Sequence, residues 1–172
     1  MRPLLRNVAA LAVLTLFAGA VVTWFAELTE DEVARNRLEG ETRILRELVA
    51  LGAGDGVPWR ARQLLSYPLT DGDLVLCERD LVVLRVDGSG YGGGFNLGVA
   101  LDLDGSIKGV RVLEHVETPG FGDILNAPSA WLDSFTTGDV HAVTGATITS
   151  RAVMSAVERA VQRVRPEEMC PP

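Results

Sequence analysis

A run of hydroxyl and glycine residues lies directly ahead of the last helix-like stretch of the sequence. The run is VTGATITS, residues 143–150, and the stretch after it carries valine and alanine on one helical face. Thr147 or Thr149 would serve there as an ordinary helix N-cap. The same position also suits a phosphate, because the free N–H groups and the dipole of a helix N-terminus attract anions. These residues alone leave both interpretations open.

The hydroxyl of Thr147 is accessible in this pattern but is not activated. Gly145 and Ala146 leave space beside it, and no orienting base is evident in the surrounding sequence. A threonine hydroxyl is a poor nucleophile without such a base. A covalent bond at Thr147 therefore requires a separate enzyme to form it.

A second group of polar residues surrounds a Pro-Gly turn. The segment HVETPGFGD, residues 115–123, places His115, Glu117 and Thr118 next to Gly120 at the end of a strand-like run. The turn itself is explained by backbone geometry. Residues at strand ends often bind ligands, however, and glycine lets the backbone approach a ligand closely. The segment is therefore a candidate binding loop.

The glycine-rich segment GSGYGGGF, residues 88–95, does not fit a phosphate-binding loop. Such loops need Gly-Lys-Ser/Thr at the start of a helix, or a strand–turn–helix context. Here a strand-like run follows the glycines. We expect a tight connection in which glycine allows close backbone contact.

Short strand-like runs and helix-like stretches position these segments. The spacing predicts four strands, at residues 73–77, 81–87, 95–103 and 107–115. Asp104-Gly105 is the expected hairpin turn between the last two. Helices are expected at 127–135 and 152–165, the second ended by Pro166. This order predicts an α+β fold, with an N-terminal transmembrane helix followed by a domain whose antiparallel sheet is packed by helices.

Twenty uncharged residues near the N-terminus, residues 7–26, are long enough to cross a membrane. A cleavable signal peptide has a shorter apolar region, and a buried core helix is rarely found at the extreme N-terminus behind two arginines. We therefore expect an uncleaved anchor. Arg2 and Arg6 precede the span and acidic residues follow it, so the N-terminus is expected in the cytoplasm. In a bacterium, the main domain then lies in the periplasm.

The predicted organisation has five parts. They are a cytoplasmic N-terminus (1–6), a transmembrane helix (7–26), a membrane-proximal helix (27–50), a periplasmic domain (51–165) and a tail (166–172). Thr29 is a candidate cap at the start of the membrane-proximal helix. Gly40 interrupts the apolar stripe of that helix.

Charge and cysteine content restrict the partners. Residues 27–172 hold 14 basic and 23 acidic residues, which argues against binding nucleic acid or lying flat on anionic lipid. Cys77 and Cys170 belong to no metal-binding pattern, and no metal site is expected. Nothing in the sequence shows that the two cysteines pair. The simplest interpretation is one core-like cysteine and one tail cysteine.

Thr144-Gly145-Ala146-Thr147 resembles the flavinylation motif of membrane flavoproteins, Ser/Thr-Gly-Ala-Thr. HVETPGFGD resembles the second signature of this FMN-binding domain family, His-x-Glu-Thr-Pro-Gly-x-Gly, and GYGGGF precedes it in the family's order. With the anchor, the resemblance covers nearly the whole chain. It is strongest to the G subunits of Rnf ion-translocating electron-transport complexes. The C subunit of the sodium-translocating NADH:quinone reductase is related.

The resemblance implies covalent FMN, joined to Thr147 by a phosphoester that a flavin transferase forms from FAD. It implies that Gly145, Ala146 and Thr149 surround the phosphate and that Glu117 and Thr118 come near the flavin ring. The other expected cofactor-binding residues are Thr144, His115 and Gly120. Residues 51–165 would then be an FMN-binding domain held at the inner membrane. The chain would transfer electrons as one subunit of an ion-translocating complex, with no complete activity alone.

One position departs from the family's pattern. The family usually has Asp three residues before the quartet, where this chain has His141, with Asp139 two residues earlier. In the family, that aspartate is associated with recognition by the transferase. We interpret His141 as a neutral substitute or a weak acceptor site, and not as a catalytic base, because it stands six residues from Thr147.

Three other hypotheses compete with this one. The chain could bind FMN as a sensor or assembly module outside a redox pump. It could be a periplasmic domain without cofactor, in which Thr147 only caps a helix. A threonine hydrolase would need an activated nucleophile that the sequence does not show.

Overall fold

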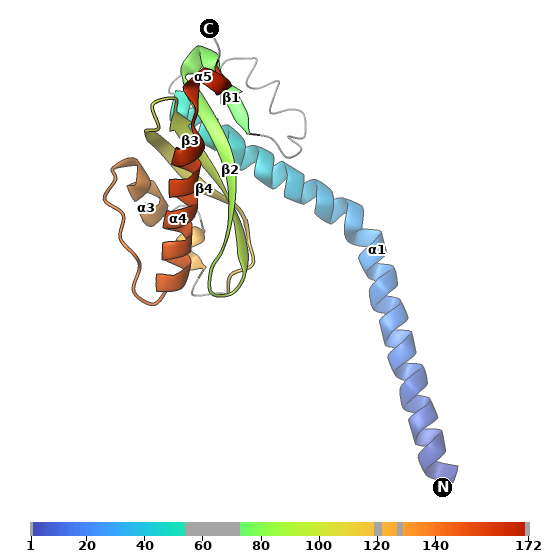
Figure 1. Cartoon of the computed structure of the whole chain (residues 1–172). Helices are drawn as coiled ribbons and strands as arrows, with labels where there is room; N and C mark the ends of the chain where they lie inside the picture. The colour runs from blue at the N-terminus through green and yellow to red at the C-terminus, as the bar shows by residue number, and fades with distance from the viewer. Residues whose placement is uncertain (1, 54–72, 119–121, 127–128, 171–172) are drawn as a thin grey trace. The chain divides into compact units, whose positions relative to one another are not determined.

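The computed structural model describes residues 2–53, 73–118, 122–126 and 129–170 (Figure 1). The chain divides into two compact units, Met1–Glu39 and Gly40–Pro172. A long helix, α1 (Arg2–Ala53), contributes its N-terminal part to the first unit and its last turns to the second. Each unit is described below by itself.

The first unit consists of the N-terminal part of α1. Within the described residues this helix holds one stretch long and apolar enough to cross a membrane, with a mean hydropathy of 2.2 over its most apolar window. None of that window is buried, and Phe17 and Trp24 are 67% and 62% exposed. The stretch is therefore not the core helix of a soluble domain, whose apolar residues would be covered.

The prediction that Thr29 caps a new helix is wrong, because α1 runs through this position. The Thr29 hydroxyl donates back to the carbonyl oxygens of Phe25 (3.1 Å) and Ala26 (3.2 Å), as a threonine inside a helix does. Gly40 also lies within the helix and does not end it. Good helix formers on both sides, mainly Glu, Arg, Leu and Ala, extend the helix across these weak helix formers.

The second unit is built on a four-stranded antiparallel sheet in the order β1-β2-β3-β4. The strands are β1 (Leu74–Leu76), β2 (Leu81–Ser89), β3 (Gly94–Asp102) and β4 (Ile107–His115). All four predicted strands are confirmed to within two residues at each end. The predicted Asp-Gly hairpin also lies between β3 and β4, where Gly105 has a φ of +89° that glycine adopts without strain.

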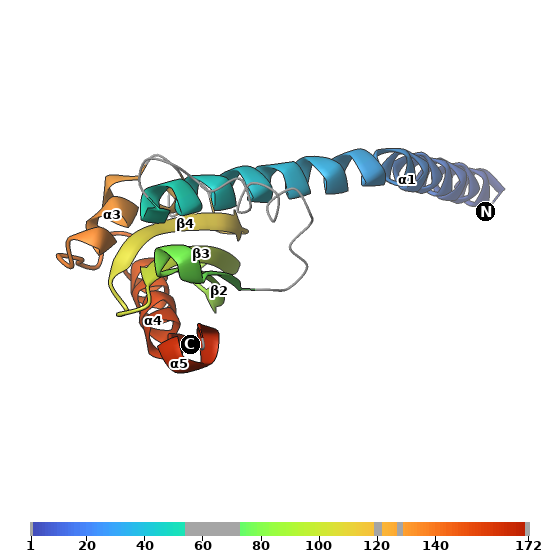
Figure 2. The ribbon, with the colours of Figure 1, turned by 90° about the horizontal axis from the view of Figure 1, so that it is seen from above.

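Helices cover both faces of the sheet, as Figure 2 shows. On one face, Leu45 and Leu48 of α1 belong to a buried cluster with Leu81 and Val83 of β2. On the other face, alternate residues of the same strands pack against α4 (Thr147–Arg163), whose buried residues include Val153. The alternation follows from the two-residue period of a strand. The predicted α+β fold is confirmed.

Short helical turns connect β4 to α4. They are η2 (Asp123–Leu125), α3 (Ala130–Asp133) and η3 (Ser134–Thr136). The helix predicted at 127–135 is shorter than expected, with residues 127–128 outside the described part of the chain. Ser129 sets the start of α3, because its hydroxyl accepts a hydrogen bond from Leu132 N at 3.2 Å, and the chain continues after Asp133 as the 3-10 helix η3.

Arg111 ties α3 to the rest of the domain. Its guanidinium donates to Glu47 of α1 at 2.7 Å and to Asp133 of α3 at 2.8 Å. Burial disfavours the charged form, but the two carboxylates outweigh it, so the pKa of Arg111 is raised above its usual value. The ion pairs hold the connection between β4 and α4 against the sheet.

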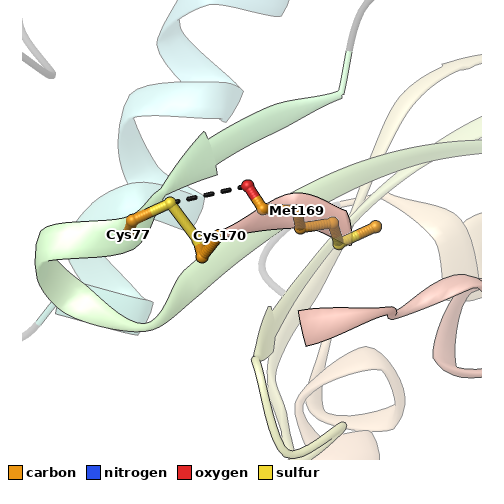
Figure 3. The surroundings of a disulfide bond; sticks show 3 residues. All are labelled: Cys77, Met169 and Cys170. Carbon is orange, nitrogen blue, oxygen red and sulfur yellow. Dashed lines mark hydrogen bonds between the residues drawn. A yellow bond between two sulfur atoms is a disulfide. The ribbon is translucent and has the colours of Figure 1, made fainter. Parts of the chain in front are cut away.

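Cys77 and Cys170 form a disulfide bond, with their Cα atoms 5.6 Å apart (Figure 3). Cys77 begins the short helix η1 (Cys77–Arg79), and Cys170 follows α5 (Pro166–Met169). The interpretation of one core-like and one tail cysteine is therefore wrong. The helix α4 ends at Arg163, two residues before the predicted end, and Pro166 starts α5, which returns the C-terminal residues to η1.

Candidate functional site

Thr147 is the first residue of α4. Gly145, with a φ of +88°, and a turn closed by Ala146 N donating to Val143 O (3.1 Å) lead the chain into the helix. Ala146 occupies the N-cap position, and no side chain caps the helix there. The Thr147 hydroxyl instead donates to Val143 O at 3.3 Å. The interpretation of Thr147 or Thr149 as the helix N-cap, one of the two left open by the sequence, is therefore wrong.

Ser150 fixes the shape of this turn, a role that was not predicted from the sequence. Its hydroxyl accepts from Val143 N at 3.1 Å and donates to Thr147 O at 3.2 Å, and the residue is fully buried. These two bonds tie both ends of the turn to the first turn of α4. The position of Thr147 is thus set by the backbone on either side of it.

The start of α4 leaves room and hydrogen-bond donors for an anion. Thr144 and Gly145 are exposed, and a Cβ placed on Gly145 would have no other heavy atom within 4 Å. Without a capping side chain, the first N–H groups of the helix have no partner within it. Such groups, together with the helix dipole, favour a phosphate. Ala146 is buried, and its packing holds the turn in place.

A buried carboxylate, Glu117, links three segments that are far apart in the sequence. Its Oε2 accepts from Gly92 N at 2.8 Å, and its Oε1 accepts from the Thr149 hydroxyl at 3.2 Å. The same hydroxyl oxygen accepts from Tyr91 N at 3.1 Å. Glu117 and Thr149 are 7% and 0% exposed. The network joins the loop after β4 to the β2–β3 turn and to the first turn of α4.

Gly90 and Gly92 explain the glycine-rich sequence of the β2–β3 turn. A Cβ on Gly90 would lie 1.9 Å from Glu117 Oε1, and one on Gly92 would lie 2.8 Å from Thr118 N. The turn therefore lies directly against the Glu117 loop, which only glycine permits. The expected tight connection with close backbone contact is confirmed. Its contact with Glu117 and Thr149 could not be read from the sequence.

We expect Gly90→Ala to destabilise the domain by about 1–3 kcal/mol, because the added methyl group overpacks the Glu117 network. Gly94→Ala is the matched control, since a Cβ there meets nothing closer than Gly88 O at 3.8 Å. Thermal unfolding of the two variants checks the difference. Equal melting temperatures would show that the turn moves away from Glu117 without cost.

His115 supports the Glu117 loop. Glu117 N donates to His115 Nδ1 at 3.3 Å, so the ring proton is assigned to Nε2, which lies 3.2 Å from Asn126 Oδ1. His115 therefore orients backbone next to Glu117. Thr118 is exposed beside Gly92, and Gly120 lies outside the described residues.

His141 lies in the exposed connection before the turn. Its Nε2 is 3.1 Å from Asp139 Oδ1, and its carbonyl oxygen accepts from Trp131 Nε1 at 2.8 Å. The sequence did not indicate either partner. Both side chains of the His141–Asp139 pair are more than four-fifths exposed, so the pair lies on the surface.

Comparisons with known proteins match this region and the chain as a whole. Residues 90–162 match the model of a protein family described as "FMN-binding domain". Proteins named as the G subunit of an ion-translocating oxidoreductase complex are similar over most of the chain. The one from Aliivibrio fischeri is 30% identical over 88% of this chain and 85% of its own length. The one from Pseudomonas aeruginosa is 30% identical over 94% and 88%. The chain therefore belongs to the family of G subunits of ion-translocating oxidoreductase complexes.

Proposed function

We propose that this chain is a membrane-anchored electron-transfer subunit that carries FMN as a phosphoester on Thr147. The observation that carries the proposal is the FMN-binding domain match over residues 90–162, which includes the glycine turn, Glu117 and the start of α4. The relatives are named as subunits of an ion-translocating oxidoreductase complex. This naming supports a place for the chain in a complex that couples electron transfer to ion movement.

The start of α4 fits the phosphate of FMN. Thr147 offers a hydroxyl at the first helical position, the uncapped N–H groups offer donors, and Gly145 leaves open space. In the attachment that we propose, the Thr147 oxygen bonds to the phosphorus of the FMN half of FAD. The bond between the two phosphates of FAD breaks, AMP leaves, and the hydroxyl proton is released. Among the residues that the structure describes, the Thr147 hydroxyl bonds to Val143 O and to no base, so a flavin transferase must catalyse this step.

FMN supplies the redox chemistry when it is bound, and the chain supplies placement and surroundings. Thr144, Gly145 and Ala146 surround the attachment point in our proposal, with Thr149 holding the helix start to Glu117. We assign Thr118 to the surroundings of the flavin ring, because it is exposed next to the glycine turn. Glu117 and His115 act on the ring through the loop that they hold.

We expect Glu117→Ala to retain the covalent flavin while changing its environment. The substitution leaves Gly92 N and the Thr149 hydroxyl without their acceptor in a buried place, which costs about 1.5–3 kcal/mol. The flavin absorption spectrum and midpoint potential should shift, while fluorescence of the denatured chain stays at the wild-type level. Complete loss of attachment would give Glu117 a role in recognition by the transferase instead.

The anchor and its orientation follow the charge pattern. Arg2 and Arg6 precede the apolar stretch, and four acidic residues follow it within six positions, which favours a cytoplasmic N-terminus and a periplasmic domain at the inner membrane. The Cys77–Cys170 disulfide supports this side, since such bonds persist in oxidising compartments. In this arrangement the anchor keeps the flavin near the membrane subunits with which it exchanges electrons.

The test of the proposal is the intact mass of the full chain co-expressed with a flavin transferase. We expect an added mass of one FMN less one water, and flavin fluorescence in a denaturing gel. Expression without the transferase should give the unmodified chain. A known substrate serves as the control that the transferase is active. If the mass of the chain is unmodified both with and without this active transferase, covalent attachment is refuted.

A further inference from the structure

A cleft beside the C-terminal half of α4 gathers arginine residues in a domain that is otherwise acidic. Its volume is about 470 Å³, and residues of β2 and the end of α4 line it: Arg85, Val86, Asp87, Arg159, Gln162, Arg163 and Arg165. Residues 27–172 carry 14 basic and 23 acidic residues, whereas four arginines and one aspartate are among the residues that line this cleft. The FMN site does not use these residues.

Two of the arginines, Arg159 and Arg163, are fixed in place by the backbone edge of β2. Pairing with β1 ends at Val83, and beyond it Arg85 O accepts from Arg163 Nη1 at 2.9 Å. Asp87 O accepts from Arg159 Nη2 at 2.7 Å. The guanidinium groups therefore stand along a rigid strand and not on freely moving side chains.

Carboxylates neutralise two of the four arginines. Arg163 pairs with Asp73, and Arg85 pairs with Glu41 at 3.2 Å. Arg85 Nε is also buried without a hydrogen-bond partner in the described part of the chain. Leu84 and Val86 on either side of Arg85 face α4, so the Arg85 guanidinium lies with Glu41 on the other face of the sheet, and Arg85 meets the arginines of α4 through its carbonyl oxygen.

The other two arginines bond to neutral oxygens within the described residues. Arg159 donates to Ser155 Oγ at 3.2 Å as well as to Asp87 O, and Arg165 donates to Gln162 O at 2.6 Å. A guanidinium has five N–H donors, so both keep donors for a ligand. The exposed carboxylate of Asp87 offsets one of these two charges at most.

We infer that this cleft docks an acidic segment of another subunit of the complex. Guanidinium groups bind carboxylates through paired hydrogen bonds, and arginine is enriched at protein interfaces. The inference rests on the proposed function in one respect, namely that the chain works within a complex. It does not depend on Thr147. Arg159, the cleft residue of α4 nearest in sequence to Thr147, lies 12 residues further along the helix, or about 18 Å along its axis, which leaves the flavin end free for electron transfer.

The test places a photo-crosslinking amino acid at Gln162, which lines the cleft, in the full chain in its native membrane. Mass spectrometry then identifies the attached peptide. We expect a peptide of another complex subunit that is rich in Asp and Glu. Arg159→Glu combined with Arg165→Glu should reduce its yield at least tenfold. The control is Arg46→Glu, which makes the same charge change per residue at an exposed position of α1 and should leave the crosslinking yield unchanged.

Two further measurements make each outcome decisive. Thermal unfolding shows whether the charge-reversed chain is folded, and Arg165→Glu alone serves if the double variant is not, because the hydrogen bonds from Arg165 Nη1 stay within the end of α4. Adducts with lipid or with a peptide poor in acidic residues, or a yield unchanged by charge reversal, would overturn the inference. Gel fluorescence of the same samples reports the flavin separately, so failure of docking and failure of flavin attachment are distinguished.

Discussion

Thr147→Ala should remove all covalently bound flavin while the domain remains folded. The substitution deletes the only oxygen through which the proposed phosphoester can form. Its structural cost is small, because the Thr147 hydroxyl is not a cap and makes one long hydrogen bond, 3.3 Å to Val143 O. We expect a loss of about 1 kcal/mol or less in the free energy of unfolding. Fluorescence of the chain in a denaturing gel and its intact mass measure the flavin.

Neighbouring hydroxyl residues provide matched controls for this result. Thr147→Ser keeps a hydroxyl and should keep the flavin. Ser155→Ala removes an exposed hydroxyl of α4 outside the motif and should also leave the attachment in place. Thr149 is fully buried and bonded to Glu117 and Tyr91, so it cannot serve as a substitute acceptor. Flavin fluorescence retained by denatured Thr147→Ala would disprove the assignment.

The strands and the turn chemistry could be predicted from the sequence because their causes are local. Alternating apolar residues and the Asp104-Gly105 dipeptide specify β3, β4 and their connection without reference to the rest of the chain. α4 begins at Thr147, five residues before the helix expected from residue 152, but the cause of this start is also local. Gly145 supplies the positive φ, and valine and alanine at helical spacing follow.

The parts that could not be predicted depend on contacts between distant segments. Glu117 and Thr149 are 32 residues apart, and no local pattern indicates that the hydroxyl donates to the carboxylate. The glycines at 90 and 92 carried a signal of close backbone contact, but not which side chain they approach. The continuity of α1 through Thr29 was missed because a capping pattern looks the same inside a helix as at its start.

The disulfide also joins distant segments, so it could not be predicted from local patterns. Its removal has the second large effect that we expect, a loss of stability. Cys77 and Cys170 are 93 residues apart, and their pairing depends on α5 returning the chain to η1. A cross-link over so long a loop restricts the unfolded chain strongly. We expect Cys77→Ser combined with Cys170→Ser to lower the free energy of unfolding by about 2–5 kcal/mol. Denaturant unfolding of the full chain in detergent measures this change.

Reduction of the wild-type chain supplies the control for that measurement. With a thiol reductant the wild type should unfold at the same denaturant concentration as the double variant, and the variant should not respond to the reductant. The covalent flavin should be unaffected in either case, because the two sites lie at opposite ends of α4. The disulfide bond lies beyond its C-terminal end, and Thr147 is its first residue. Loss of flavin from the folded double variant would mean that the two ends of α4 are coupled. An unchanged unfolding midpoint would show that the apolar contacts of α4 with the sheet hold the C-terminal residues without the bond.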